Sequence, residues 1–350
     1  MYATVEASKR LIEASRSLLG GGDAPVAQAG LDLLRDQVCA EAGVWEPMAA
    51  ARAIRQARGD LARAVTLVRV WAATLPPQAA EPCSDGSIRV TRRISAAFAR
   101  IPGGQWLGAS PDFESRLLEW GDDRDDAGVR EPGPAAAQPT ETGSNGMAAP
   151  SRAPTRRELG RVASAVRSAP GIAVAATREP EDGPDPFDQP LGTHPGREAR
   201  QAALARGETG ALVALANVAL TGRREAVAGE LCVGVAELRV PHPRTGRPVR
   251  IADVPISEAT VLGDAEVDGA AGFQLGFGAG VGRVERRALA GAVLDATLEA
   301  GAKVGGLEEL PALAAVDGLA TSGFVDHLRL PHFASFASYV DRVRTIEEDE

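Results

Sequence analysis

Apolar residues in the first third of the chain recur every three or four positions, which is the period of an amphipathic helix. The run over residues 6–19 ends at three consecutive glycines, Gly20–Gly22. Asp60 precedes a later run, where its carboxylate can accept hydrogen bonds from the first turn of a helix. We therefore expect a helical amino-terminal domain over residues 1–120. Its further helices are expected at about 26–42, 47–57, 60–75, Ile88–Ala99 and Phe113–Trp120.

Residues 121–155 have a different composition, rich in Pro, Gly, Ser, Ala and charged side chains. Such a segment cannot bury enough apolar surface to offset the entropy lost on ordering. We therefore expect a disordered linker over residues 121–157. A second stretch, 178–196, carries five prolines and several acids, and we expect it to be a loose loop.

The remaining chain, residues 158–350, mixes helical and alternating patterns. Helices are expected at 197–206, 209–220 and 283–300, and strands at about 229–240 and 248–254. The sequence thus predicts an α+β fold, with a helical amino-terminal domain, a disordered linker and a mixed α/β carboxy-terminal domain.

Charge and cysteine content narrow the class of protein. A net charge of -9 argues against a nucleic-acid binder, which needs a cationic face to displace counterions. No segment approaches the roughly 20 apolar residues that span a bilayer, so we expect no membrane insertion. The cysteines, Cys39, Cys83 and Cys232, are odd in number and widely spaced, which predicts neither disulfides nor a cysteine metal site. These features favour a cytoplasmic protein.

Several phrases resemble the I subunit of the bacterial phosphonate carbon–phosphorus lyase system (PhnI), and they occur in that family's order along nearly the whole chain. The first are MYATVEASKRLIEAS at the start and RRISAAFARIPGGQWLGASPDFESRLLEW at 92–120. The later ones are RGETGALVALANVAL, AGELCVGVAEL, GFGAGVGRVERRALAGAVLDATL and GFVDHLRLPHFASF. Their length and order make the resemblance specific, because an isolated glycine-rich loop proves little.

The resemblance implies a subunit that assembles with the G, H and J subunits and transiently with the L and K ATP-binding subunits. It implies that the chain alone cleaves the N-glycosidic bond of ATP or GTP. Within the complex it implies glycosyl exchange on MgATP, in which methylphosphonate replaces the purine and ribose 1-methylphosphonate 5-triphosphate forms. The chain departs from the family pattern at Glu225 and Ala226, where a His-Pro pair is expected, and at Leu275, where an arginine is expected.

Two histidines, His327 and His332, lie in the phrase DHLRLPH, where a turn at Pro331 could aim both imidazoles at one ion. Two ligands alone leave an open site, and the residues equally allow two partly buried histidines at a loop. The resemblance implies that this pair binds zinc facing the J subunit. Asp326 is adjacent and could orient a ring.

A glycine-rich stretch precedes the helix expected at 283–300. Its glycines, Gly276, Gly278, Gly280 and Gly282, predict a flexible loop whose N–H groups could bind phosphate, with Arg286 adding charge. The alternative is a glycine-rich strand and turn that allows tight subunit packing.

Substitution at an anomeric carbon passes through an oxocarbenium-like state that a carboxylate stabilises. Glu230 and Glu285 lie in family-like phrases and are the predicted catalytic acids, although either could be a plain salt-bridge partner. A non-catalytic scaffold subunit of the lyase complex is the alternative function. An independent zinc hydrolase is weaker, because the chain has no HExxH or similar three-ligand motif.

Overall fold

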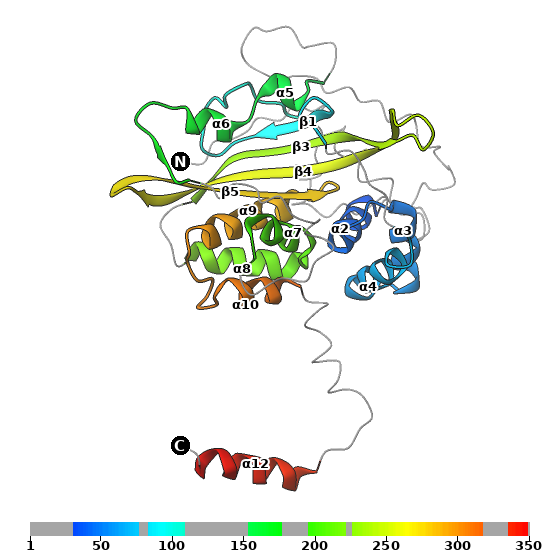
Figure 1. Cartoon of the computed structure of the whole chain (residues 1–350), viewed down its shortest axis with the longest axis vertical. Coiled ribbons are helices and arrows are strands. Elements are labelled where there is room, and N and C mark those ends of the chain that lie inside the picture. Colours follow the sequence, from blue (N-terminus) through cyan, green and yellow to red (C-terminus); the bar gives the residue numbers. More distant parts are fainter. Residues whose placement is uncertain are drawn as a thin grey trace, which may run out of the picture.

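The computed structural model describes residues 31–76, 83–108, 153–176, 195–221, 226–317 and 335–348. Its centre is a five-stranded sheet in the order β1-β3-β4-β5-β2, antiparallel except for β2, which runs parallel to β5 (Figure 1). The strands are β1 Ile88–Ile94, β2 Ala173–Val174, β3 Ala226–Pro241, β4 Pro248–Val267 and β5 Ala270–Val281. The expected α+β class is confirmed.

Helices cover both faces of this sheet. Figure 1 shows α7 to α10 together against one face, α2 to α4 beside them, and α5 and α6 on the opposite side with β1. The first helices are α2 Asp32–Ala42, α3 Pro47–Gln56, α4 Leu61–Ala72, α5 Arg156–Leu159 and α6 Val162–Arg167. The others are α7 Arg197–Arg206, α8 Thr209–Thr221, α9 Glu285–Glu299, α10 Glu309–Val316 and α12 Phe336–Glu348. None of these helices is long and apolar enough to cross a bilayer.

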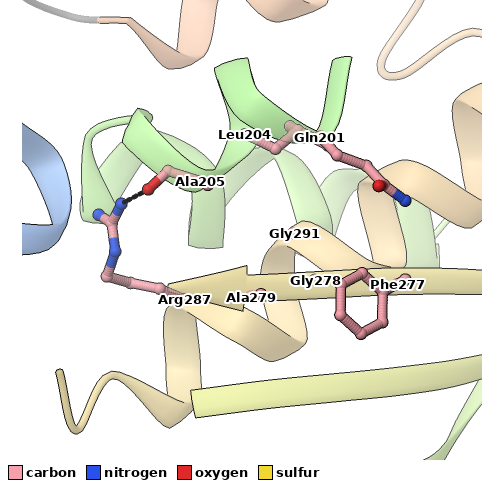
Figure 2. A pocket seen from close by; sticks show the side chains of 8 residues that line it. All are labelled: Gln201, Leu204, Ala205, Phe277, Gly278, Ala279, Arg287 and Gly291. Atoms are coloured by element: carbon pink, nitrogen blue, oxygen red, sulfur yellow. Dashed lines mark hydrogen bonds between the residues drawn. The ribbon is translucent and has the colours of Figure 1, made fainter. Parts of the chain in front are cut away.

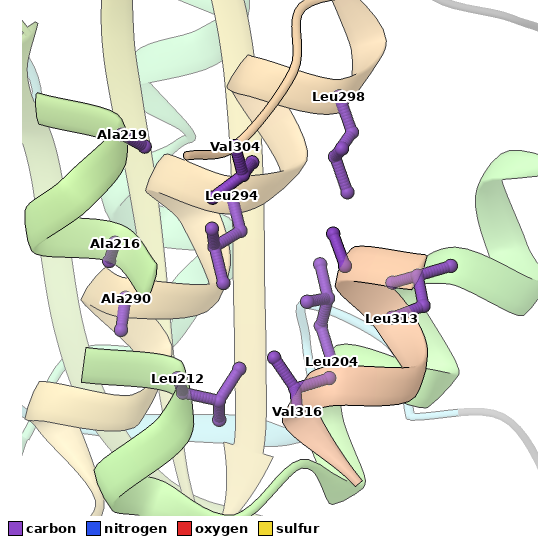
Figure 3. Packing of buried hydrophobic residues seen from close by; sticks show 11 residues of the cluster. Leu204, Leu212, Ala216, Ala219, Ala290, Leu294, Leu298, Val304, Leu313 and Val316 are labelled. Atoms are coloured by element: carbon purple, nitrogen blue, oxygen red, sulfur yellow. The ribbon is translucent and has the colours of Figure 1, made fainter. Parts of the chain in front are cut away.

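The largest apolar cluster joins α7, α8, α9 and α10 (Figure 3). Leu212 of α8, Leu294 of α9 and Leu313 of α10 are all nearly inaccessible to solvent and fill its centre. The side of α9 that faces the sheet carries small residues instead, with Ala288 and Ala292 against β3 and β4. Large side chains therefore hold the helices to one another, and small ones allow α9 to lie close to the strands.

Helices α2, α3 and α4 form a separate apolar cluster around Val38, Val65 and Val68. Asp60 caps α4 by accepting from Arg63 N at 3.1 Å, which confirms the expected N-cap. The expected helices at 26–42, 47–57 and 60–75 are confirmed over the described residues, with slightly shorter bounds. The expected runs at 6–19 and Phe113–Trp120 lie outside those residues.

The helix expected at Ile88–Ala99 is wrong, because Ile88–Ile94 is strand β1 and pairs antiparallel with β3. The physical reason is alternation, since Ile88 and Val90 are buried while Arg89 and Thr91 are exposed. Strand β1 belongs to the range expected to form the helical amino-terminal domain, yet it enters the same sheet as β3.

The last residues of the expected linker are ordered. Pro154 O accepts from Val90 N at 2.8 Å, and Thr155 caps α5 in a capping box with Glu158. The linker prediction over 121–157 is therefore too long by the residues from 153 on, and the remainder lies outside the described part of the chain.

In the last half of the chain, the helices expected at 197–206, 209–220 and 283–300 are confirmed. Both expected strands are present but longer, as β3 and β4. Strand β5 was expected only in the alternative interpretation of Gly276–Gly282 as a glycine-rich strand and turn.

Candidate functional site

Glu230 lies in a buried ion cluster between the sheet and α5. Its carboxylate accepts from Arg93 Nε and Arg156 Nη1 at 2.5 Å each, from Arg156 Nη2 at 2.9 Å and from Val162 N at 3.1 Å. The side chains of Glu230 and Arg93 are 1% and 0% exposed. Strands β3 and β1 supply these two residues, and the capped turn at Thr155 presents Arg156.

Burial alone would raise the pKa of Glu230, but the hydrogen bonds and charges of Arg156 and Arg93 outweigh it and lower that pKa. The arginines are satisfied elsewhere too, because Arg93 also donates to the carbonyls of Pro102, Gly104 and Gly160. Each carboxylate oxygen of Glu230 thus accepts two hydrogen bonds from groups of the protein itself. This geometry favours the salt-bridge interpretation of Glu230 over direct contact with a substrate.

Glu285 occupies the first turn of α9 and is more accessible. Its carboxylate lies 3.2 Å from Arg92 Nε, with side-chain exposures of 18% for Glu285 and 10% for Arg92. Arg286, the next residue, is exposed to solvent. Of the two acids predicted from sequence, Glu285 is therefore the one with a side chain that a ligand can reach.

The glycine-rich stretch is a strand and a turn. Gly276, Gly278 and Gly280 lie in β5, so the expectation of a flexible loop is wrong at these positions, whereas Gly282 makes a turn with φ 93°. A Cβ on Gly276 would lie 2.0 Å from Ala292 O, and one on Gly278 would lie 2.1 Å from Ala288 O. The glycines are required because α9 passes directly against the strand, which matches the alternative of a glycine-rich strand made for close packing, here within one chain.

The N-terminus of α9 already has internal partners. Asp36 of α2 accepts from Arg283 N at 2.9 Å and from Arg283 Nε at 2.8 Å, and Ser257 Oγ accepts from Val284 N at 2.9 Å. These bonds occupy the N–H groups of Arg283 and Val284, the two residues before α9, which are therefore not available to a phosphate. Within the predicted phosphate site, Arg286 is the member whose side chain faces solvent.

A small cavity of about 40 Å³ lies between α7, β5 and α9 (Figure 2). Its lining residues are Gln201, Leu204, Ala205, Phe277, Gly278, Ala279, Arg287 and Gly291. It is far below the roughly 300–1,000 Å³ of a typical ligand pocket. Gly278, assigned to phosphate binding from sequence, thus lines a space that cannot hold a nucleotide.

Arg287 forms one wall of this cavity and is almost fully buried. It donates to Gly207 O and Thr209 Oγ1 at 2.7 Å each and to Ala205 O at 2.9 Å, and it lies 3.3 Å from Glu41. Burial lowers its pKa to about 10, partly countered by Glu41. Arg287 therefore joins α9 to α2, α7 and the start of α8, and its Nη1 and Nη2 groups already donate to these elements.

The sequence analysis missed a second buried cluster around Asp295 of α9. This fully buried carboxylate accepts from Phe277 N at 2.9 Å and lies 2.7 Å from Arg197 and 3.2 Å from Arg200 of α7. Arg200 also bonds Glu299 and, at 2.7 Å, Glu309 of α10. An acid inside the apolar run of 283–300 was the only sequence signal, and it did not identify partners nearly a hundred residues away.

The predicted zinc ligands His327 and His332, with Asp326, lie outside the described residues. Among the residues that the structure does describe, no group of three or more His, Cys, Asp or Glu is placed to hold a metal ion. The zinc prediction therefore rests on the sequence.

Comparison with known proteins identifies the chain. A family model described as bacterial phosphonate metabolism protein (PhnI) matches residues 1–350. A putative C-P lyase subunit protein, HtxH of Stutzerimonas stutzeri, is 33% identical over 359 aligned residues, covering 98% of this chain and 93% of the relative. The alpha-D-ribose 1-methylphosphonate 5-triphosphate synthase subunit PhnI of Escherichia coli (strain K12) is 30% identical and covers 100% of this chain and 99% of the relative. The same-named subunit of Rhizobium meliloti (strain 1021) is 29% identical over 93% of this chain and 86% of the relative.

By class, the chain is thus a bacterial phosphonate metabolism protein with an α+β fold held together by buried ion clusters. It belongs to the PhnI family, which confirms the resemblance seen in the sequence.

Proposed function

We propose that the chain is the PhnI-type subunit of a carbon–phosphorus lyase complex and carries out glycosyl exchange on MgATP. Methylphosphonate replaces the purine, and ribose 1-methylphosphonate 5-triphosphate forms. Alone, the chain hydrolyses the N-glycosidic bond of ATP or GTP. The observation that carries the proposal is the end-to-end match to relatives named as subunits of this synthase.

The reaction places positive charge on the ribose ring as the purine leaves, so a carboxylate near the anomeric carbon lowers the barrier. Glu285 suits this role because its side chain is partly exposed at the start of α9. Arg286 beside it offers an exposed cation for the triphosphate. Glu230 has a positioning role in this proposal, because its ion pairs with Arg93 and Arg156 hold β3 to β1 and α5.

The partners in this proposal are the G, H and J subunits, with the L and K subunits bound transiently, in the cytoplasm where ATP is available. His327 and His332 hold zinc in the proposed assembly, because neutral imidazoles are ordinary zinc ligands. Two ligands leave positions that the neighbouring Asp326 or a partner can fill.

Incubation with ATP, followed by chromatographic separation of adenine from ADP, tests the reaction. We expect the wild-type chain to release adenine, and the complex with methylphosphonate to convert that release into formation of the phosphonate ester. ADP as the sole product would overturn the reaction class, because a phosphoanhydride bond would have broken instead.

A non-catalytic scaffold is the second candidate function. Two observations on the described residues favour it. The cavity between α7, β5 and α9 is too small for a nucleotide, and the carboxylate of Glu230 is paired with Arg93 and Arg156. Absence of purine release from the fully assembled wild-type complex would support the scaffold.

A further inference from the structure

The outer part of the β3–β4 hairpin extends beyond the neighbouring strands. Strand β1 pairs with β3 only as far as Ala236, and β5 pairs with β4 only from Ile256 onward. Residues 237–255 therefore form a two-stranded arm, visible in Figure 1 as the hairpin that extends past the ends of β1 and β5. Its base is fixed by single backbone bonds, from Glu237 N to Ser87 O and from Gly282 N to Pro255 O.

One face of the arm is charged and internally paired. Arg239 lies 2.9 Å from Glu237, and Arg250 lies 2.6 Å from Asp253, which also meets Arg89 of β1 at 3.1 Å. The residues of this face stand directly opposite each other in register, as Glu237 with Asp253 and Arg239 with Arg250. The charges on this face are paired with one another, so the face offers little unpaired charge to a partner protein.

The other face of the arm is apolar. Leu238 is opposite Ala252 and Val240 is opposite Val249, so these four side chains share one face of the ribbon. Val249 is 41% exposed, and Ile251, at the bulge beside this face, is 55% exposed. An isolated two-stranded ribbon with an exposed apolar face gains little from folding alone. Such a face is typical of a surface that another protein covers.

The tip of the arm is a hydrogen-bonded turn with a basic composition. His242 N donates to Arg247 O at 2.9 Å, and His242 O accepts from Gly246 N at 2.8 Å, which closes the turn. Residues 238–251 contain four arginines and no acid, in a chain whose net charge is -9. Within the described residues, the side chains of Arg244 and Arg247 form no ion pair and are exposed. The free charge of the arm is therefore concentrated at its end.

Prolines disfavour strand addition at the edges of the arm. Pro241, Pro248 and Pro255 lie in its two strands and have no N–H to offer an incoming strand. Side chains on the apolar face, rather than an open backbone edge, are therefore available for binding.

We propose that the arm, residues 237–255, is a docking element that lays Leu238, Val240 and Val249 on a partner subunit whose apolar surface is bordered by carboxylates. Those carboxylates pair with Arg244 and Arg247 at the tip. Charge complementarity carries the choice of an acidic protein partner, because the tip is cationic while the arm has no Phe, Tyr or Trp on which a nucleic-acid base could stack. The proposal rests on the proposed function in taking the partner to be another subunit of the lyase complex.

The test titrates the purified full chain onto the assembled partner subunits. Three variants alter the arm: Val249→Lys, the pair Arg244→Glu and Arg247→Glu, and a shortened arm in which Asn-Gly replaces residues 239–251 between Leu238 and Ala252. We expect each to bind the partners about tenfold more weakly or worse, as for central interface residues, with an unchanged melting temperature. Met48→Lys and Arg63→Glu, at exposed positions of α3 and α4, are matched controls and should bind as the wild type.

Wild-type affinity in all three arm variants would overturn the docking proposal and leave the proposed function intact. Loss of self-association alone, measured by light scattering, would assign the arm to a second copy instead. Loss of binding to a labelled oligonucleotide alone would assign it to nucleic acid. If the wild-type chain neither binds the partners nor releases adenine from ATP, the proposed function itself fails, and the docking proposal fails with it.

Discussion

Arg156 holds Glu230 through two parallel hydrogen bonds, from Nη1 to Oε1 at 2.5 Å and from Nη2 to Oε2 at 2.9 Å. The pair joins α5 to β3 across 74 residues of sequence, and both side chains are almost inaccessible to solvent. Bidentate pairing of this kind fixes geometry as well as charge. Arg93 completes the cluster from β1, so one carboxylate ties three distant segments together.

Replacement of Glu230 by glutamine should destabilise the protein by about 3–5 kcal/mol, because it leaves the buried Arg93 without its counter-charge and Arg156 with only Glu258, 3.3 Å from its Nε. Thermal unfolding of purified protein measures this loss. Asp85→Asn removes the partner of Arg161 in a pair whose side chains are about one-third exposed, and should cost less than about 1 kcal/mol. An E230Q variant that melts like the wild type but no longer releases adenine would instead assign Glu230 to catalysis.

Stability should fall as the pH drops below about 4.5, the usual range of a glutamate in an unfolded chain. Burial tends to raise the pKa of Glu230, but Arg156 and Arg93 outweigh it and lower that pKa, and a hydrogen bond from Arg161 lowers the pKa of Asp85. A lowered folded-state pKa gives stability that is present above the unfolded pKa and is lost as pH falls through the folded value. Melting temperatures between pH 7 and pH 3 measure this loss, and E230Q should show a shallower acid dependence. Equal slopes in both proteins would contradict the assignment.

Gly278→Ala should destabilise the fold by about 1–3 kcal/mol or more, because the new methyl group overlaps the backbone of α9. Gly263→Ala in β4 is the control, since its Cβ would meet only Gln274 O, at 3.8 Å. Denaturant unfolding of both variants compares the two sites. If Gly278 binds phosphate in a flexible loop, G278A would instead weaken ATP binding while leaving stability unchanged.

Glu285→Gln should lower the rate of purine release by about a hundredfold or more if its carboxylate stabilises the developing charge. Because Arg92 is buried, the loss of its charged partner should also lower the free energy of unfolding by about 1–3 kcal/mol. Single-turnover adenine release and thermal unfolding separate the two effects. A variant that releases adenine at the wild-type rate would leave Glu285 as a salt-bridge partner only.

Alanine at His327 or His332 should reduce zinc bound to the purified complex and slow phosphonate-dependent growth, while assembly persists. The double variant should lose little more than either single variant, because removal of one ligand already breaks a shared site. Elemental analysis and growth on methylphosphonate give the two readouts. Additive losses with metal retained would show that the histidines do not share an ion.

Helices were predictable from the sequence because their signals are local. The N-cap at Asp60 and the apolar periods of 197–206 and 209–220 each lie within a few residues of the structure they produce. Strand β1 was not predictable in the same way, since Arg92 and Arg93 look like an exposed polar face but are buried in ion pairs. Their burial depends on acids far away in the sequence.

The sequence predicted which residue types belong to the candidate site, but it did not predict how those residues are arranged. Gly276 and Gly278 were singled out for phosphate binding, but whether they form a loop or a strand depended on α9 lying against them. Glu230 was also singled out, yet its role follows from Arg93 and Arg156, which one sequence does not place beside it. Asp295 was missed because an acid in a helical run is ordinarily a solvated one.

The pairing of β1 with β3 has a consequence for the order of folding during synthesis. Arg93 emerges from the ribosome 137 residues before its partner Glu230, which at usual translation rates is roughly 7–27 s. The β3–β4–β5 meander and α9 are close in sequence and can form among themselves, whereas β1 must wait for a distant strand. The nascent chain therefore carries the segment Ile88–Ile94 without its partner strand while at least 137 further residues are made, and the sheet closes only after the meander exists.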